Sequence, residues 1–279
     1  MLSMHSSVFR DMFTLPLPPN NEEMIENCPV VVLSGDTAQD WSLLLEALFP
    51  KSYSTELPNL ELLAAMLRLG KKYDFPRFRE DSVRWLKQDF SSTLEEYDEH
   101  DAEFNFKLED TTSTYLFIAS LAREIGLPSL LPLCYAEVVT DYEGEAMKKI
   151  LDLNDSSVNT IDRLACLAGH HKLLNLQSTT MFAWLDLDME SAHIPTENCR
   201  QSIACGAAIK KIFIDISRQH PPPIMILNPW DKDWDASLCS SCRKKAKKLH
   251  DTGRETCWEA MPAAFGLPEW AELKSLDFE

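Results

Sequence analysis

The chain has 279 residues, of which 45% are hydrophobic and 25% are charged, an ordinary composition for a folded, water-soluble protein. Its formal net charge of −17 repels phosphate backbones, which argues against nucleic acid as the principal partner. Only eight glycines are present, and neither G-x-G-x-x-G nor G-x-x-x-x-G-K-[ST] occurs, which excludes the glycine-rich nucleotide loops. The length favours two compact units over a single one.

The cellular compartment is predicted from what the sequence lacks. The N-terminal residues do not have the basic and apolar regions of a secretory signal, and no uncharged stretch reaches the ~18 residues of a membrane span. We therefore expect an intracellular protein, in the cytoplasm or the nucleus, whose eight cysteines stay reduced. Cys28, Cys134 and Cys166 lie among apolar neighbours and are expected to be small buried side chains.

The first ninety residues predict a short helix, a strand and three longer helices. Residues 1–16 carry apolar side chains at helical spacing, as though the chain opened inside a core. The sequence PVVVLSGD at 29–36 predicts a buried strand. Thr37 and Asp40 form a capping box, which starts a helix over 37–50. Further helices are expected over 59–75, where apolar residues lie almost all round, and over 77–90.

An acidic segment follows these helices. Between Glu95 and Asp110 there are eight acidic residues and one lysine, a composition that buries too little apolar area to become ordered. It predicts a solvated linker over residues 93–112. An acidic interaction motif is the alternative.

The second half predicts a helical domain. Helices are expected over 113–128, 128–142, 155–175 and 196–219. The first of these should bury Ile118, Leu121, Ala122 and Ile125, and the third should bury Ile161, Leu164, Ala165 and Ala168. His170 and His171 point about 100° apart on a helix, which favours a surface role over a shared metal. The expected fold class is α+β and predominantly α.

The order of elements in the first ninety residues resembles a BTB/POZ domain. VFRDMF resembles the helix before the family's third strand, PVVVLSGD that strand, and LLAAMLRLGKKYDFPRFREDSVRWL the closing helical hairpin. The whole chain is similar to fungal BTB-domain proteins, with which it shares LAREIGLPSLLP, a segment like CLAGHHKLL and a W…FGLPEW ending. The resemblance implies a BTB/POZ-like domain over 1–92, the linker at 93–112, a BACK-like helical domain over 113–220 and a C-terminal extension over 221–279.

The resemblance also identifies a departure at the N-terminus. Family members begin with a β-hairpin and a first helix, which would precede LSMHSSVFRDMF. The sequence is therefore expected to be N-terminally incomplete, or else a natural variant without the hairpin. In either case the PVVVL strand loses sheet partners, because a lone strand leaves backbone groups unpaired.

Motifs for catalysis are not found. The chain contains no G-x-S-x-G elbow, no H-E-x-x-H and no kinase motif set, so we expect no enzymatic activity and no organic cofactor.

A C-x-x-C pair near the C-terminus is the one motif that carries chemistry. Cys239 and Cys242 have a spacing at which two thiolates grip one Zn²⁺, and His250 and Cys257 are the residues expected to complete a structural site. Cys199 and Cys205 are rival ligands on the preceding helix. Packing of metal-free cysteines and a redox pair remain the alternatives, although the pair lacks the βαβ context of a thioredoxin-like motif.

Two further C-terminal features bear on function. RKKAKK at 243–248 is the only basic cluster; it is typical of a solvated helix face, with nuclear localisation or nucleic-acid contact as the alternative. The final FGLPEWAELKS is too apolar for a free tail, so it is expected to dock on the helical domain.

The sequence thus predicts a non-enzymatic protein–protein interaction module. The resemblance implies homodimerisation, weakened by the missing N-terminal elements, and adaptor contacts such as docking on a cullin scaffold. The alternative is a transcriptional regulator that uses the C-terminal zinc and basic segment on nucleic acid. No membrane association is expected.

Overall fold

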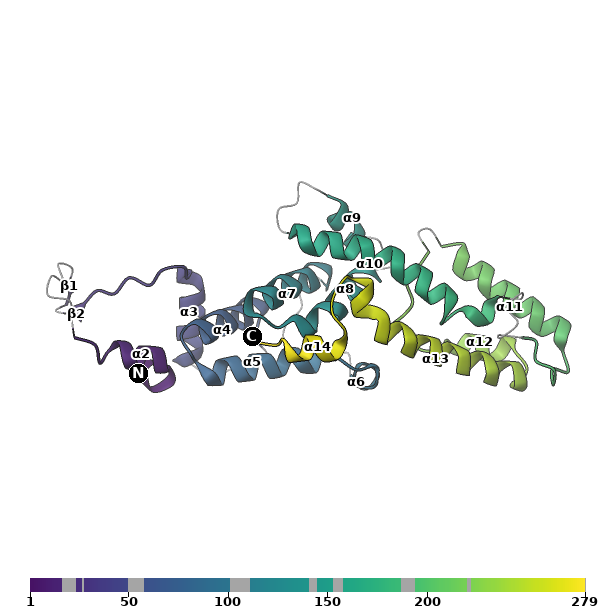
Figure 1. Ribbon diagram of the computed structural model, residues 1–279, viewed down its shortest axis with the longest axis horizontal. Helices are drawn as coiled ribbons and strands as arrows, with labels where there is room; N and C mark the ends of the chain where they lie inside the picture. Colours follow the sequence, from purple (N-terminus) through teal and green to yellow (C-terminus); the bar gives the residue numbers. More distant parts are fainter. Residues whose placement is uncertain are drawn as a thin grey trace. The chain divides into compact units, whose positions relative to one another are not determined.

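The computed structural model describes residues 1–16, 24–26, 28–49, 58–100, 111–140, 145–152, 158–186, 194–219 and 222–278. The chain folds as two compact units (Figure 1). Unit 1 comprises Met1–Phe90 with His100–Glu109, and unit 2 comprises Ser91–Glu99 with Asp110–Glu279. The described residues are mostly helical, which confirms that helices predominate. Within those ranges, every helix is too short or too polar to cross a lipid bilayer.

Unit 1 consists of short N-terminal elements followed by three longer helices. Its elements are α1 (Leu2–His5), α2 (Ser7–Met12), β1 (Met24–Ile25), β2 (Cys28–Pro29), α3 (Ala38–Leu48), α4 (Leu60–Lys72) and α5 (Pro76–Asp89). The predicted cap of α3 is confirmed, since Thr37 Oγ1 accepts a hydrogen bond of 3.0 Å from the backbone N–H of Asp40. Asn59 caps α4 in the same way, at 2.8 Å from the N–H of Leu62.

Aromatic and aliphatic side chains from α2, α3, α4 and the turn after α4 form a core cluster in unit 1. The core residues are Phe9, Leu44, Met66, Leu69, Tyr73 and Phe75. Phe9 stacks on Tyr73 with ring centroids 5.1 Å apart. Helix α4 packs against both of its neighbours in the chain, α3 and α5 (Figure 1). This explains why its sequence is apolar almost all round.

The predicted strand over 29–36 is wrong. Of residues 28–36, only Cys28 and Pro29 are in strand conformation, and they pair antiparallel with Met24 and Ile25. Val31 and Val32 are 54% and 83% exposed. An apolar run becomes a strand only when another segment completes its hydrogen-bond ladder, and in the described part of the chain that ladder ends at Pro29.

Unit 2 is built from helices throughout its described residues. The helices are α6 (Leu94–Glu99), α7 (Thr111–Ile125), α8 (Leu131–Val139), α9 (Glu145–Leu151), α10 (Thr160–Thr179), α11 (Ser202–Ser217), α12 (Lys232–Ser237), α13 (Ser240–Ala264) and α14 (Trp270–Ser275), with 3₁₀ turns at Pro128–Leu130 and Ala183–Leu185. The predicted inward face of α7 is confirmed, because Ile118, Leu121, Ala122 and Ile125 are buried.

The C-terminal residues are integrated into unit 2. Gln177 on α10 donates to the carbonyl of Pro223 and accepts from the N–H of Met225, each at 2.8 Å, which fixes the segment before α12. The predicted docking of the apolar tail is confirmed: Phe265 packs against Tyr135, and Trp270 stacks on Trp258.

The predicted inward face of α10 is wrong. Ile161 and Leu164 are 57% and 62% exposed, and the helix instead buries Asp162, Arg163, Cys166, Gly169, Leu173 and Gln177. Asp162 accepts from Tyr135 OH and, at 2.6 Å, from Arg123 Nε. Because these hydrogen bonds satisfy the buried polar groups, α10 can bury its polar face.

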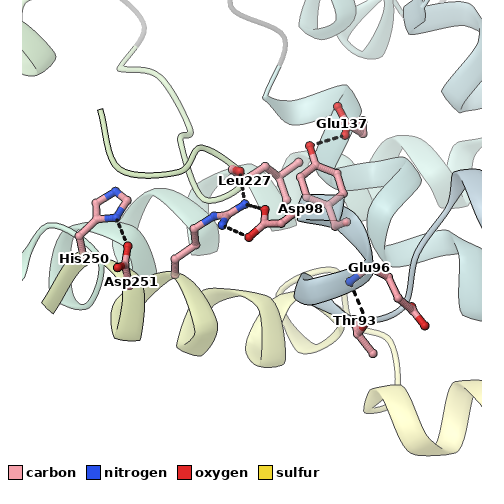
Figure 2. Close-up of polar contacts among 9 residues, drawn as sticks. Thr93, Glu96, Asp98, Glu137, Leu227, His250 and Asp251 are labelled. Atoms are coloured by element: carbon pink, nitrogen blue, oxygen red, sulfur yellow. Dashed lines mark hydrogen bonds and ion pairs between the residues drawn. The ribbon is translucent and has the colours of Figure 1, made fainter. Parts of the chain in front are cut away.

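The expected solvated linker is also wrong over Leu94–Glu99, where the chain forms α6. Tyr97 packs against Trp258, with ring centroids 5.6 Å apart. The guanidinium of Arg254 donates to the carboxylate of Asp98 at 2.5 and 2.6 Å and to the carbonyl of Leu227. Figure 2 labels both acceptor residues. One aromatic contact and one bidentate ion pair thus order an acidic helix. The rest of the acidic segment, 101–110, lies outside the described residues.

Candidate metal centre

Four cysteines converge where two helices of unit 2 begin. Cys199 precedes α11, and Cys205 lies in its first turn. Cys239 is the N-cap residue of α13, and Cys242 is the third residue of that helix. Each helix therefore contributes one cysteine before its start and one inside its first turn, an arrangement set by local sequence spacing.

The sulfur atoms of these four cysteines are close enough to share one ion. All four lie within 4.8 Å of one another, and the Sγ atoms of Cys199 and Cys239 are 3.6 Å apart. Four thiolates around a tetrahedral Zn²⁺, each about 2.3 Å from the metal, are separated by about 3.8 Å. The cluster therefore has the size of a tetrathiolate metal site, and all eight cysteines of the chain are free thiols.

Backbone N–H groups surround the sulfur atoms. The N–H of Thr196 donates to Cys242 Sγ, and the N–H of Cys239 donates to Cys205 Sγ, both at 3.4 Å. Thr196 Oγ1 also lies 2.8 Å from Ser241 Oγ, which holds the segment containing Thr196 against the start of α13. Such donors stabilise negative charge on sulfur and orient the thiolates.

The four thiols differ in acidity. The backbone N–H of Cys242 lowers the pKa of Cys239 to about 7, as expected for a thiol at a helix N-terminus. Burial raises the pKa of Cys199, Cys205 and Cys242, and the N–H of Gln201 partly offsets that effect at Cys199. Close thiols resist joint deprotonation, because each thiolate disfavours the next unless a cation is bound among them.

His250 does not belong to this site, contrary to the expectation from the sequence. Along α13 the rise from Cys242 to His250 is about 12 Å. His250 is completely buried, and its ring packs against Trp230, Trp234 and Phe182. Its Nδ1 lies 3.5 Å from Asp251 Oδ1, a contact drawn in Figure 2. Burial lowers the pKa of His250, which favours the neutral ring.

Cys257 does not belong to the site either. It lies about 22 Å along α13 from Cys242. Its Sγ is 3.3 Å from Thr180 Oγ1, and burial raises its pKa. The fold thus brings Cys239 and Cys242 together with the rival pair, Cys199 and Cys205. The C-x₅-C spacing of that pair was visible in the sequence, but nothing local placed it beside the C-x-x-C pair.

The other cysteines are separate from the cluster. Cys134 and Cys166 are completely buried, which confirms their expected place in the core, and burial raises the pKa of both thiols. Cys28 is exposed, so its predicted burial is wrong, because the strand expected to bury it ends at the next residue.

The four-cysteine arrangement can hold a metal ion, because its four sulfur atoms lie within 4.8 Å of one another. Comparison of the chain with protein-family models, with curated proteins and with solved structures found no match in any of the three.

Proposed function

We propose that this protein is a non-enzymatic protein–protein interaction module that associates with itself, as a weak homodimer, through unit 1. The supporting observation is the distribution of exposed apolar side chains. Of the eighteen large apolar side chains exposed among the described residues, eleven lie in the first 49 residues: Met1, Met4, Val8, Phe13, Leu15, Met24, Ile25, Val31, Val32, Leu45 and Phe49. Exposed apolar surface of this density favours contacts with another protein.

The order of helices in unit 1 supports a BTB/POZ-like assignment. Helices α3, α4 and α5 follow one another and pack in sequence, as the closing part of that domain does by resemblance. One feature opposes a tight dimer. The PVVVL segment is not a strand beyond Pro29, so it does not offer a long ladder for pairing with a second chain. Association through side chains alone is therefore expected to be weak.

Light scattering over a dilution series tests the proposal. The protein should be dimeric at high concentration and should dissociate as it is diluted. The double variant Phe13→Ser/Val32→Ser should shift dissociation to higher concentration, since both side chains are exposed at 59% and 83%. Leu164→Ser is the matched control, because that leucine is 62% exposed but lies on α10 of unit 2. A wild-type protein that is monomeric at every concentration contradicts the proposal.

A second function, nucleic-acid binding by the C-terminal segment, is supported by one observation. Arg243, Lys244, Lys247 and Lys248 are exposed on α13, directly after two of the clustered cysteines. The net charge of −17 opposes such binding. Retention on immobilised DNA that decreases with salt and is lost in Lys244→Glu/Lys248→Glu would support this function, and retention unaffected by the variant would contradict it.

A further inference from the structure

We propose that Cys199, Cys205, Cys239 and Cys242 bind one structural Zn²⁺, which ties the start of α11 to the start of α13. The inference goes beyond the interaction function proposed above and does not depend on it, because all four cysteines lie in unit 2. The carrying observation is that four sulfur atoms, from two separate segments, lie within 4.8 Å of one another.

The ligand set selects the metal and its role. Thiolates are soft ligands that prefer zinc among the abundant divalent cations, whereas Mg²⁺ and Ca²⁺ require oxygen ligands. Four protein ligands fill the tetrahedral shell of Zn²⁺ and leave no position for water or substrate. The ion is therefore structural and not catalytic.

The surroundings of the sulfur atoms are suited to thiolates. Cys205 and Cys242 accept N–H hydrogen bonds from Cys239 and Thr196, at 3.4 Å each. Both cysteine pairs lie at helix N-termini, where the helix dipole favours negative charge. Metal-free packing would explain the burial of Cys205 and Cys242, but it does not require donors directed at sulfur.

The ion would also join two segments that lie far apart in the sequence. Thirty-three residues separate Cys205 from Cys239 in the sequence, and α11 does not start with a side-chain cap. A metal held from both segments supplies folding free energy to this end of unit 2, since the ligand geometry is absent in the unfolded chain.

Metal analysis of the purified full chain tests the site. Wild-type protein kept reduced should contain about one zinc per chain. Replacing any of Cys199, Cys205, Cys239 or Cys242 by Ser should abolish the zinc content. Cys257→Ser is the matched control on the same helix and should retain it. A wild-type protein that carries no zinc and takes none up after reduction overturns the proposal, as does zinc that persists in Cys199→Ser/Cys205→Ser.

A second measurement uses only the wild-type protein and therefore does not depend on the folding of a variant. Iodoacetamide should label the exposed Cys28 at once, with or without a strong chelator, and the buried Cys134 in neither case. Cys199 and Cys239, which are partly exposed, should be labelled only after chelation. Labelling of these two at the rate of Cys28 before chelation overturns the proposal. So does a disulfide within the cluster, detected by mass after non-reducing denaturation.

Discussion

The two units of this protein differ in how many large apolar side chains they leave exposed. Unit 1 has a small aromatic core around Phe9 and Tyr73, and it leaves eleven large apolar side chains exposed within 49 residues. Unit 2 exposes seven such side chains among its described residues, although it is the larger unit. Among the described residues, unit 2 therefore covers more of its apolar surface than unit 1 does.

Both units bury polar groups, which in unit 1 include Ser6, Asp40 and Asp89. Unit 2 buries Asp162, Arg163, Gln177 and Arg254, all with hydrogen-bond partners. Its helices therefore depend on particular pairings and close contacts, and single substitutions there should have large effects. Substitutions on the exposed surface of unit 1 should have small effects on stability. Four predictions test this contrast, in order of decreasing effect.

Gly253→Ala should destabilise unit 2 most. A Cβ at this position would lie 2.3 Å from the Cα of Met181, so α13 would have to move away from that backbone. The expected loss is about 3 kcal/mol in the free energy of unfolding, measured by urea denaturation. Gly206→Ala is the control: its Cβ would meet only Pro195 at 3.9 Å, and stability should rise by about 0.5 kcal/mol. Equal stability of both variants would contradict the close-contact argument.

Glu137→Gln should stabilise unit 2 above neutral pH. Burial raises the pKa of Glu137 to about 7 from an ordinary value of 4.5, and Tyr97 OH donates to its Oε1 at 3.1 Å (Figure 2). The folded state binds the proton of Glu137 more tightly than the unfolded state does. The stability that this protonation contributes is full below pH 4.5 and is lost as pH rises through 7.

The glutamine cannot ionise, so the variant does not lose this stability as pH rises. Its amide oxygen still accepts a hydrogen bond from Tyr97. The expected gain is about 2–3 kcal/mol at pH 8 and close to zero at pH 4, measured by urea denaturation at both values. Glu259→Gln, an exposed position on α13, should change stability little at either pH. A gain that is independent of pH would show that the buried charge is not its cause.

Arg254→Met should release α6 from unit 2. It removes the bidentate pair with Asp98 and the hydrogen bond to Leu227, at an expected cost of about 2 kcal/mol. Asp98→Asn should cost about 1 kcal/mol, because its side chain is 45% exposed and its amide oxygen still accepts. Amide hydrogen exchange over 94–99 measures the release. Exchange that stays slow in Arg254→Met would mean that Tyr97 alone holds the helix.

Phe13→Ser should have the smallest effect on folding. Its side chain is 59% exposed in unit 1, so the free energy of unfolding of diluted, monomeric protein should change by less than about 0.5 kcal/mol. Leu273→Ser is the contrasting change in unit 2, where the side chain is 1% exposed and truncation should cost several times more. A similar loss in the free energy of unfolding for both variants would contradict the expected difference between the two units.

Features that depend on neighbouring residues in the sequence were predictable. The cap at Thr37, the apolar run that forms α4 and the inward face of α7 are set within one or two helical turns, where spacing dictates which side chains share a face. The C-x-x-C pair was recognisable for the same reason, since Cys239 caps the helix whose first turn contains Cys242.

Features that depend on distant segments were decided only by the tertiary structure. The PVVVL segment needed strand partners, α6 needed Arg254, and the polar face of α10 needed Arg123 and Tyr135 before it could be buried. Likewise, Cys239 and Cys242 lie beside Cys199 and Cys205 because the beginnings of α11 and α13 meet. His250 and Cys257 lie further along α13, and the rise of the helix keeps them away from the cluster. Local spacing places two cysteines of the cluster, and long-range packing brings the other two beside them.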